Sequence, residues 1–165
     1  MSTRLVLIAD THIPRRAQRL PDAVLAAIDD ADLVIHAGDW VEASVFEELS
    51  KRADVLGVFG NNDSRDLRER LPEIARRDVE GVRIAVTHET GPARDREARM
   101  DVIFPGVDVL VFGHSHIPWD TTSPRGMRLL NPGSPTDRRR QPQCTFMTAV
   151  ADDGAIRDVE LVPIT

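Results

Sequence analysis

Hydrophobic residues occur in this chain as short continuous runs instead of a strict alternation with polar residues. Residues 4–9, 32–37 and 54–59 are apolar along most of their length. Such runs are typical of strands that are buried on both faces. The pattern predicts three interior strands in the first sixty residues.

Two segments between these strands have the spacing of helices. Pro21 is a start signal for a helix that runs to about Asp29. Residues 42–52 place apolar side chains at Val45, Phe46 and Leu49, with polar residues on the opposite face. Strands alternating with helices predict a parallel sheet with right-handed crossovers.

The remaining chain is richer in β-like segments. Residues 74–79 and 82–87 flank Glu80-Gly81, which suits a tight hairpin and an antiparallel addition to the sheet. Residues 107–112 form another buried run. The segments 119–123, 127–130, 143–150 and 156–164 predict antiparallel strands, and we expect this C-terminal third to form a second sheet packed on the first. The charged stretch 91–100 predicts an exposed helix with a solvated face.

Length and composition fit one soluble domain. The 165 residues, 41% of them hydrophobic, are enough for a sizeable core, so we expect a single domain over residues 1–165. The net charge of −6 makes nucleic acid and anionic membranes poor partners. No run is long enough to span a membrane or serve as a secretory signal. The single cysteine, Cys144, excludes a disulfide framework and is expected to be a small buried strand residue. We expect a cytoplasmic location.

Polar residues that can bind metal follow five of the predicted strands. Because parallel strands present their carboxyl ends at one edge of a sheet, we expect these side chains to meet there. Mixed nitrogen and oxygen donors in this number are too many for one tetrahedral ion but suit two ions that share a carboxylate. Two such ions can promote a displacement at phosphorus. The residues are Asp10, His12, Asp39, Asn61, His88, His114 and His116.

Each of these residues taken alone has a simpler explanation. Asp10 and His12 could be turn and cap residues, Asn61 an ordinary turn residue, and a lone His-x-His an exposed turn. His36 lies inside a strand, so we interpret it as a buried, hydrogen-bonded histidine that supports the site. The convergence of the set favours the metal site.

The same residues form motifs that resemble those of a known family. Asp10-Thr11-His12, Gly38-Asp39, Gly60-Asn61-Asn62-Asp63, His88 and Gly113-His114-Ser115-His116 are similar, in order and spacing, to the motifs of calcineurin-like metallophosphoesterases. The short length is most similar to the small YfcE-type phosphodiesterases, and Asn131-Pro132-Gly133-Ser134 resembles a motif of that branch. The resemblance implies a four-layer α/β/β/α sandwich of two mixed sheets.

The resemblance also implies a ligand set and a mechanism. One metal would be held by Asp10, His12 and His116, the other by Asn61, His88 and His114, and Asp39 would bridge them. A hydroxide between the ions would attack the phosphorus of a small phosphoester. The resemblance implies two divalent ions, with Mn²⁺ expected first and Zn, Fe, Ni or Co as alternatives, and a homodimer or higher oligomer.

Two positions depart from the family pattern. Many relatives have a histidine where this chain has Asn62, and an amide cannot act as a general acid. Asn62 can still donate a hydrogen bond to a phosphoryl oxygen, so we expect slower turnover and a preference for diesters with good leaving groups. Glu89 follows His88, where relatives more often carry a small residue, and could narrow the pocket or add negative charge beside it.

Nearby arginines are candidates for binding the substrate's second phosphate substituent. Arg15 and Arg16 follow the first ligand pair closely. The run Arg138-Arg139-Arg140 is a weaker candidate, because it could be only a mobile loop.

Two other functions remain open from the sequence. A scaffold of the same fold exists as a subunit of eukaryotic retromer, but a scaffold has no need to keep seven metal-type residues. A nuclease would fit the chemistry, but the acidic balance and the seven aromatic residues offer little for nucleic-acid binding. The leading interpretation is a metal-dependent phosphodiesterase or phosphatase.

Overall fold

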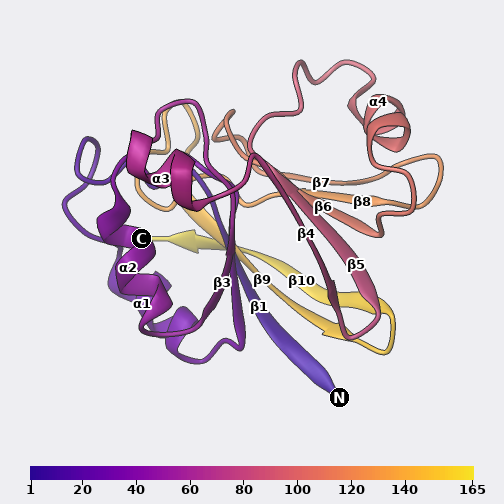
Figure 1. The fold of residues 1–165 in the computed structure, drawn as a ribbon, viewed down its shortest axis with the longest axis horizontal. Coiled ribbons are helices and arrows are strands. Elements are labelled where there is room, and N and C mark those ends of the chain that lie inside the picture. The colour runs from indigo at the N-terminus through magenta and orange to yellow at the C-terminus, as the bar shows by residue number, and fades with distance from the viewer.

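The computed structural model describes residues 1–165, which form two sheets of five strands each with helices outside them (Figure 1). The first sheet contains β1 (Ser2–Ile8), β2 (Leu33–His36), β3 (Asp54–Gly57), β9 (Cys144–Asp152) and β10 (Ala155–Ile164), in the order β10-β9-β1-β2-β3. The second contains β4 (Ile74–Val79), β5 (Val82–Thr87), β6 (Val109–Val111), β7 (Trp119–Thr122) and β8 (Arg128–Asn131), in the order β4-β5-β6-β8-β7.

The helices form the two outer layers. The helices α1 (Asp22–Asp29), α2 (Ala43–Ser50) and α3 (Arg65–Arg70) lie on the side of the first sheet, and α4 (Arg96–Ile103) lies on the side of the second (Figure 1). The layers therefore run helix, sheet, sheet, helix. The four-layer α/β/β/α sandwich expected from the resemblance is confirmed.

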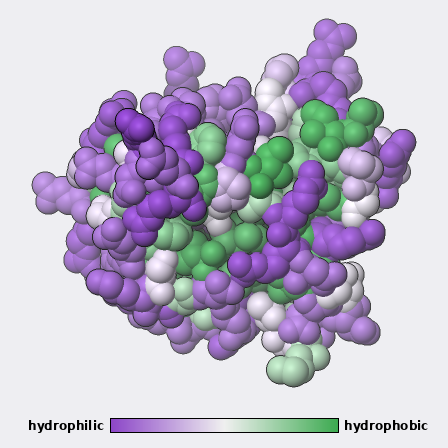
Figure 2. Space-filling model, in the orientation of Figure 1, coloured by the Kyte–Doolittle hydropathy of each residue, from purple (hydrophilic) through white to green (hydrophobic).

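Three hydrophobic clusters fill the three spaces between these layers. In β1, Leu5 and Leu7 point toward the second sheet, whereas Val6 and Ile8 point toward the helices. This follows from the period of two in a strand, and it explains why the run is apolar at every position. Hydrophilic residues predominate on the face shown in Figure 2.

Both sheets are mixed. β1 pairs in parallel with β2, and β2 with β3, as the alternation of strands and helices predicts. On its other side β1 pairs antiparallel with β9. The hairpin at Glu80-Gly81 is confirmed, because β4 and β5 are antiparallel with Val79 opposite Val82.

The predicted division of strands between the sheets is wrong. β9 and β10 extend the first sheet, and the hairpin of β4 and β5 belongs to the second. The candidate residues therefore converge from two sheets, not from one sheet edge. Apolar patterning reports that a strand is buried but not which partner covers it, because every space between layers here is apolar.

Three local expectations also need correction. The sequence pattern missed α3, because this six-residue helix buries only Leu67. The charged segment before Met100 is not simply a solvated face: Arg96 is buried, with its guanidinium near the rings of Phe112 and Trp119. Cys144 is half-buried at the start of β9.

Candidate metal centre

The loops that follow β1, β2, β3, β5 and β6 bring all seven candidate residues together. Five of the seven have a positive φ angle, between 47° and 74°. A left-handed backbone is uncommon for residues other than glycine and costs about 1 kcal/mol or more at each position. Such conformations concentrate at functional sites. The five are Asp10, His12, Asp39, His114 and His116.

The first group consists of Asp10, His12 and His116, and all three are buried. Asp10 Oδ1 lies 3.8 Å from His12 Nε2 and 3.6 Å from His116 Nε2. Each of these three atoms lacks a hydrogen-bond partner, although buried polar atoms are normally paired. Two ligand atoms about 2.1 Å from one tetrahedral ion are roughly 3.4 Å apart. The group therefore has the chemistry and nearly the spacing of a cation site.

The second group consists of Asp39, His88 and His114, with Asn61 beside them. Asn61 Oδ1 lies 3.0 Å from His88 Nε2 and 3.2 Å from His114 Nδ1. His88 Nε2 is 3.4 Å from Asp39 Oδ2. The His114 side chain is 41% exposed, so this group opens to solvent while the first is enclosed. A ligand would approach from the side of the second group.

Asp39 lies between the two groups. Its Oδ2 is 3.5 Å from His12 Nε2 in the first group and 3.4 Å from His88 Nε2 in the second. Asn62 donates its backbone N–H to Asp39 Oδ1 and its side-chain N–H to Oδ2. Burial opposes the charged form, but the hydrogen bonds and charge of His88 and the bonds from Asn62 hold the pKa of Asp39 well below its usual range. Asp39 is therefore a carboxylate at neutral pH.

Backbone carbonyls orient two of the histidines. His88 Nδ1 donates to Ala37 O at 2.8 Å, and His116 Nδ1 donates to Asp137 O at 2.6 Å. In both rings the bond from Nδ1 fixes the ring so that Nε2 is directed into the site. Burial lowers the pKa of His88, but the hydrogen bond to Asp39 and the charges of Asp10 and Asp39 more than offset this and raise it to about 9. Burial lowers the pKa of His116.

His36 supports the site without entering it, as the sequence interpretation proposed. Its Nδ1 accepts from the N–H of Gly38, so Nε2 carries the proton and donates to Thr11 Oγ1. The ring stacks on Trp40 with centroids 3.6 Å apart. Burial holds the pKa of His36 well below its usual value, which keeps the ring neutral.

Similarity to known proteins extends over nearly the whole chain. The sequence model of the calcineurin-like phosphoesterase superfamily domain matches residues 3–154. The chain belongs to this superfamily. A probable metallophosphoesterase of Methanothermobacter thermautotrophicus is 36% identical over 158 residues, which cover 94% of this chain and 90% of the relative.

Two solved structures resemble this chain along nearly its whole length. A Thermotoga maritima protein determined by solution NMR has 35% identity and a TM-score of 0.76, and the match covers 98% of this chain and 99% of that one. Vps29 of Chaetomium thermophilum, solved with a cyclic peptide, matches with a TM-score of 0.74 and 19% identity over 98% of this chain and 96% of that one. At this identity the second likeness shows only the fold. The family implies divalent metal ions, and the orphaned donors of the first group fit such an ion.

Sequence reasoning assigned no role to two supports of this calcineurin-like phosphoesterase site. The carboxylate of Asp63 accepts backbone N–H bonds from Asp39, Val41 and Gly60 at 3.0, 2.6 and 2.7 Å. It thereby joins the loop after β2 to the loop after β3. Only its place in the Gly-Asn-Asn-Asp motif hinted at this role.

The second support is the loop between β8 and β9. Ser134 Oγ donates to the carbonyl of Asp10, and Thr136 Oγ1 donates to that of Thr11. Asn131 Nδ2 donates to Gly113 O. The Asn-Pro-Gly-Ser motif thus anchors the loops on both sides of the first metal-type group.

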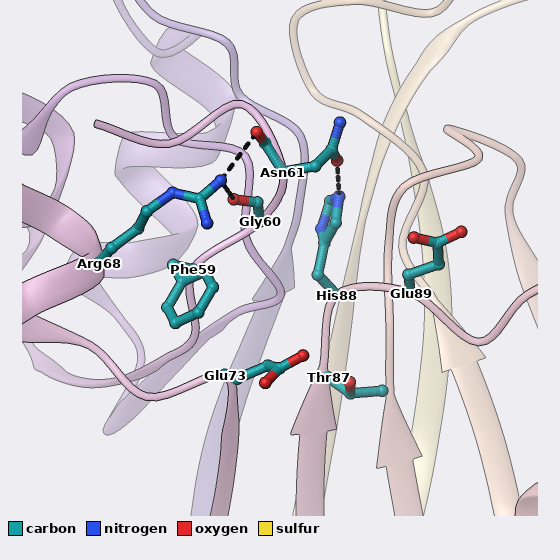
Figure 3. Close-up of a pocket in the computed structure, with 8 residues that line it drawn as sticks. All are labelled: Phe59, Gly60, Asn61, Arg68, Glu73, Thr87, His88 and Glu89. Carbon is teal, nitrogen blue, oxygen red and sulfur yellow. Dashed lines mark hydrogen bonds between the residues drawn. The ribbon is translucent and has the colours of Figure 1, made fainter. Parts of the chain in front are cut away.

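A pocket of about 230 Å³ opens beside the second group (Figure 3). Its wall includes Glu73 and Glu89, and Glu89 Oε1 lies 3.7 Å from His114 Nε2. Arg68 also lines the pocket, but it donates to the carbonyl groups of Gly60 and Asn61 and so holds the loop that carries Asn61. Glu89 therefore adds negative charge at this side of the phosphoesterase site, one of the two effects considered from the sequence.

The two predicted substrate arginines do not line this pocket. Arg15 and Arg16 are exposed in the loop after β1. Arg16 Nε lies 3.6 Å from Asp137 Oδ2, so part of its charge is compensated. None of the helices combines the length and the apolar character that crossing a membrane requires.

Proposed function

We propose that this chain is a metal-dependent phosphodiesterase with two divalent ions in one site. Asp10, His12 and His116 would hold the first ion, and Asn61, His88 and His114 the second. Asp39 would bridge the pair. We expect Mn²⁺ as the working metal. A mixed set of imidazole, carboxylate and amide ligands also accepts Zn, Fe, Ni or Co.

One observation carries this proposal. A single oxygen, Asp39 Oδ2, lies 3.5 Å from an imidazole nitrogen of one group and 3.4 Å from an imidazole nitrogen of the other. Distances of this size would allow one carboxylate to reach cations in both groups. The three unpartnered buried atoms of the first group add an independent reason for a cation there.

Bound ions of this kind supply an activated water and neutralise charge on a phosphoryl group. The residues of the chain itself keep the ligand groups in the required charge state and orientation. Asp39 stays ionised through its bonds to His88 and Asn62. The Nδ1 bonds of His88 and His116 to backbone carbonyls fix both rings, so little reorganisation is needed when a ligand arrives.

Asn62 shapes the choice of substrate. One N–H of its amide is used by Asp39 Oδ2 at 2.8 Å, and the second N–H is free to donate to a phosphoryl oxygen. Neither can protonate a departing alkoxide. We therefore propose that esters with acidic leaving groups are turned over faster than alkyl esters, and diesters faster than monoesters.

The test is metal content followed by hydrolysis of two chromogenic esters with Mn²⁺ added. Protein as purified is analysed for metal, and bis(p-nitrophenyl) phosphate is compared with p-nitrophenyl phosphate. The proposal expects up to two ions per chain, higher kcat/KM for the diester, and loss of at least about a hundredfold in Asp39→Asn.

The matched control is Asp152→Asn, which removes a carboxylate at the opposite end of the first sheet. It should leave hydrolysis unchanged. Full activity in Asp39→Asn would remove the bridging role, and a fully loaded protein with one ion would refute the two-ion site.

A protein-interaction module is the second candidate function. The Vps29 neighbour was solved with a peptide bound, which raises peptide binding as an alternative for this fold. Against it stands the completeness of the seven metal-type residues at five strand ends. Metal-loaded protein that hydrolyses neither ester would favour the module.

A further inference from the structure

The rim of the candidate metal centre is divided by charge. The side of the second group carries Glu73 and Glu89, and its one arginine, Arg68, donates to the backbone carbonyls of Gly60 and Asn61. Arg15 and Arg16 lie in the loop after β1 that carries His12, and the run Arg138-Arg139-Arg140 follows Asp137, whose carbonyl accepts from His116 Nδ1. The chain as a whole has a net charge of −6, so this basic side is a local feature.

Within the arginine run the three side chains have different environments. Arg138 folds back on its own loop, and its Nη1 donates to Gln141 O at 2.7 Å. Arg139 and Arg140 are exposed and lie outside ion-pairing distance of any carboxylate, whereas Arg16 has Asp137. Two of the three guanidinium groups are therefore available to an anion.

These two arginines line a pocket next to the histidines. The pocket has a volume of about 400 Å³ and is bounded by Ser115, Ile117, Arg139, Arg140 and Gln141. Ser115 and Ile117 alternate in sequence with His114 and His116. Arg139 Nη1 lies 3.5 Å from the carbonyl oxygen of His114, so the guanidinium borders the metal-type residues.

We propose that Arg139 and Arg140 form a subsite for a second anionic group, a carboxylate or a phosphate, carried on one alcohol of the phosphoester substrate. This inference rests on the proposed phosphodiesterase function. Guanidinium groups bind carboxylate and phosphate through paired, charge-assisted hydrogen bonds. Glu89, whose Oε1 lies 3.7 Å from His114 Nε2, repels an anion, so the charged alcohol would lie over the arginines and the other alcohol toward Glu89.

The kinetic test uses two diesters with the same p-nitrophenol leaving group. One carries propanol as the second alcohol and the other carries 3-hydroxypropanoate, so they differ by one distal carboxylate. The wild-type protein should have a KM for the carboxylate ester roughly tenfold below that for the neutral ester. Arg139→Gln should remove this difference and leave the KM of the neutral ester within about twofold.

Arg138→Gln is the matched control, because it removes the same charge from the adjacent position. A specific subsite predicts that Arg138→Gln keeps the preference, and Arg140→Gln weakens it. An equal loss of the preference for the carboxylate ester in all three variants would show that only the diffuse electrostatic field of the loop acts. This result would overturn the subsite. A preference that survives in Arg139→Gln would overturn it as well.

A binding measurement separates this inference from the proposed function. Calorimetry compares 3-phosphonopropanoate and propane-1,3-bisphosphonate with methylphosphonate, none of which is hydrolysed. Tighter binding of either bifunctional ligand that is lost in Arg139→Gln supports the subsite even if the protein hydrolyses no ester. Equal binding of all three ligands would refute the subsite even if the protein is an active phosphodiesterase.

Discussion

Asp63→Asn tests whether one buried carboxylate holds the loops of the candidate metal centre together. Asp63 Oδ2 accepts from the N–H groups of Asp39 and Gly60, and Oδ1 accepts from that of Val41 at 2.6 Å. An asparagine in the same place can keep its oxygen at the Oδ2 position. Its NH₂ group then faces the N–H of Val41, donor against donor.

The magnitude follows from these three bonds. Hydrogen bonds to a charged acceptor contribute about 1.5–3 kcal/mol each, and a buried donor left unpaired costs about 1–3 kcal/mol. One bond is lost, and two change from a charged to a neutral acceptor. Burial raises the pKa of Asp63 although the three N–H groups oppose this, so removing the charge returns some free energy. We expect a net loss of about 3 kcal/mol in the free energy of unfolding.

Urea unfolding of the metal-free protein measures this loss directly. In a chain of this size the loss corresponds to a fall in Tm of roughly 6–12 °C. The affinity for Mn²⁺ should fall as well, because Asp39 and Asn61 lose their common anchor. Asp108→Asn is the control: its carboxylate is partly exposed and pairs with Arg83, so about 1 kcal/mol or less should be lost. A loss below about 1 kcal/mol in Asp63→Asn, or unchanged Mn²⁺ affinity, would show that the loops are held by other contacts.

Three further variants or conditions test other parts of the site. Asn62→His should raise kcat for alkyl diesters by roughly tenfold and change p-nitrophenyl esters little, because it adds a general acid; no gain with poor leaving groups would contradict the role given to Asn62. Binding of Mn²⁺ at pH 8 should release about one proton per chain, because the pKa of His88 near 9 keeps its imidazole protonated until a metal displaces the proton. Calorimetry in two buffers of different ionisation enthalpy measures the release, which should vanish in His88→Gln and above about pH 10. Gly60→Ala should abolish activity, because its methyl group would lie 2.6 Å from the backbone nitrogen of Asp39; retained kcat/KM would mean that the Asp39 loop can move aside.

The sequence predicts the candidate residues better than it predicts the sheets. Asp10, Asp39 and His114 follow short apolar runs, and the ends of buried strands can be located from such runs alone. The assignment of β9 and β10 to the first sheet could not be made in this way. It depends on the long-range pairing of Leu7 with Met147, which no local pattern reports.

The supports of the site were harder to predict than the candidate ligands. Asp63 and Thr136 form hydrogen bonds with backbone groups of other loops. Residues of these types are also common in ordinary turns, so their presence in the sequence does not reveal such a role. The environment of Arg96 was misinterpreted because its neighbours in sequence are charged, while the rings near its guanidinium belong to Phe112, which follows β6, and Trp119 in β7. Contacts of this kind exist only after the layers have packed.

Both metal-type groups draw residues from both sheets. Asp10 and His12 follow β1 of the first sheet, whereas His116 follows β6 of the second, and Asp39 and His88 are divided in the same way. A cation coordinated there fastens the two halves of the sandwich to each other. Metal binding would therefore stabilise the joined state of the two sheets against unfolding, in addition to the apolar cluster that already packs between them.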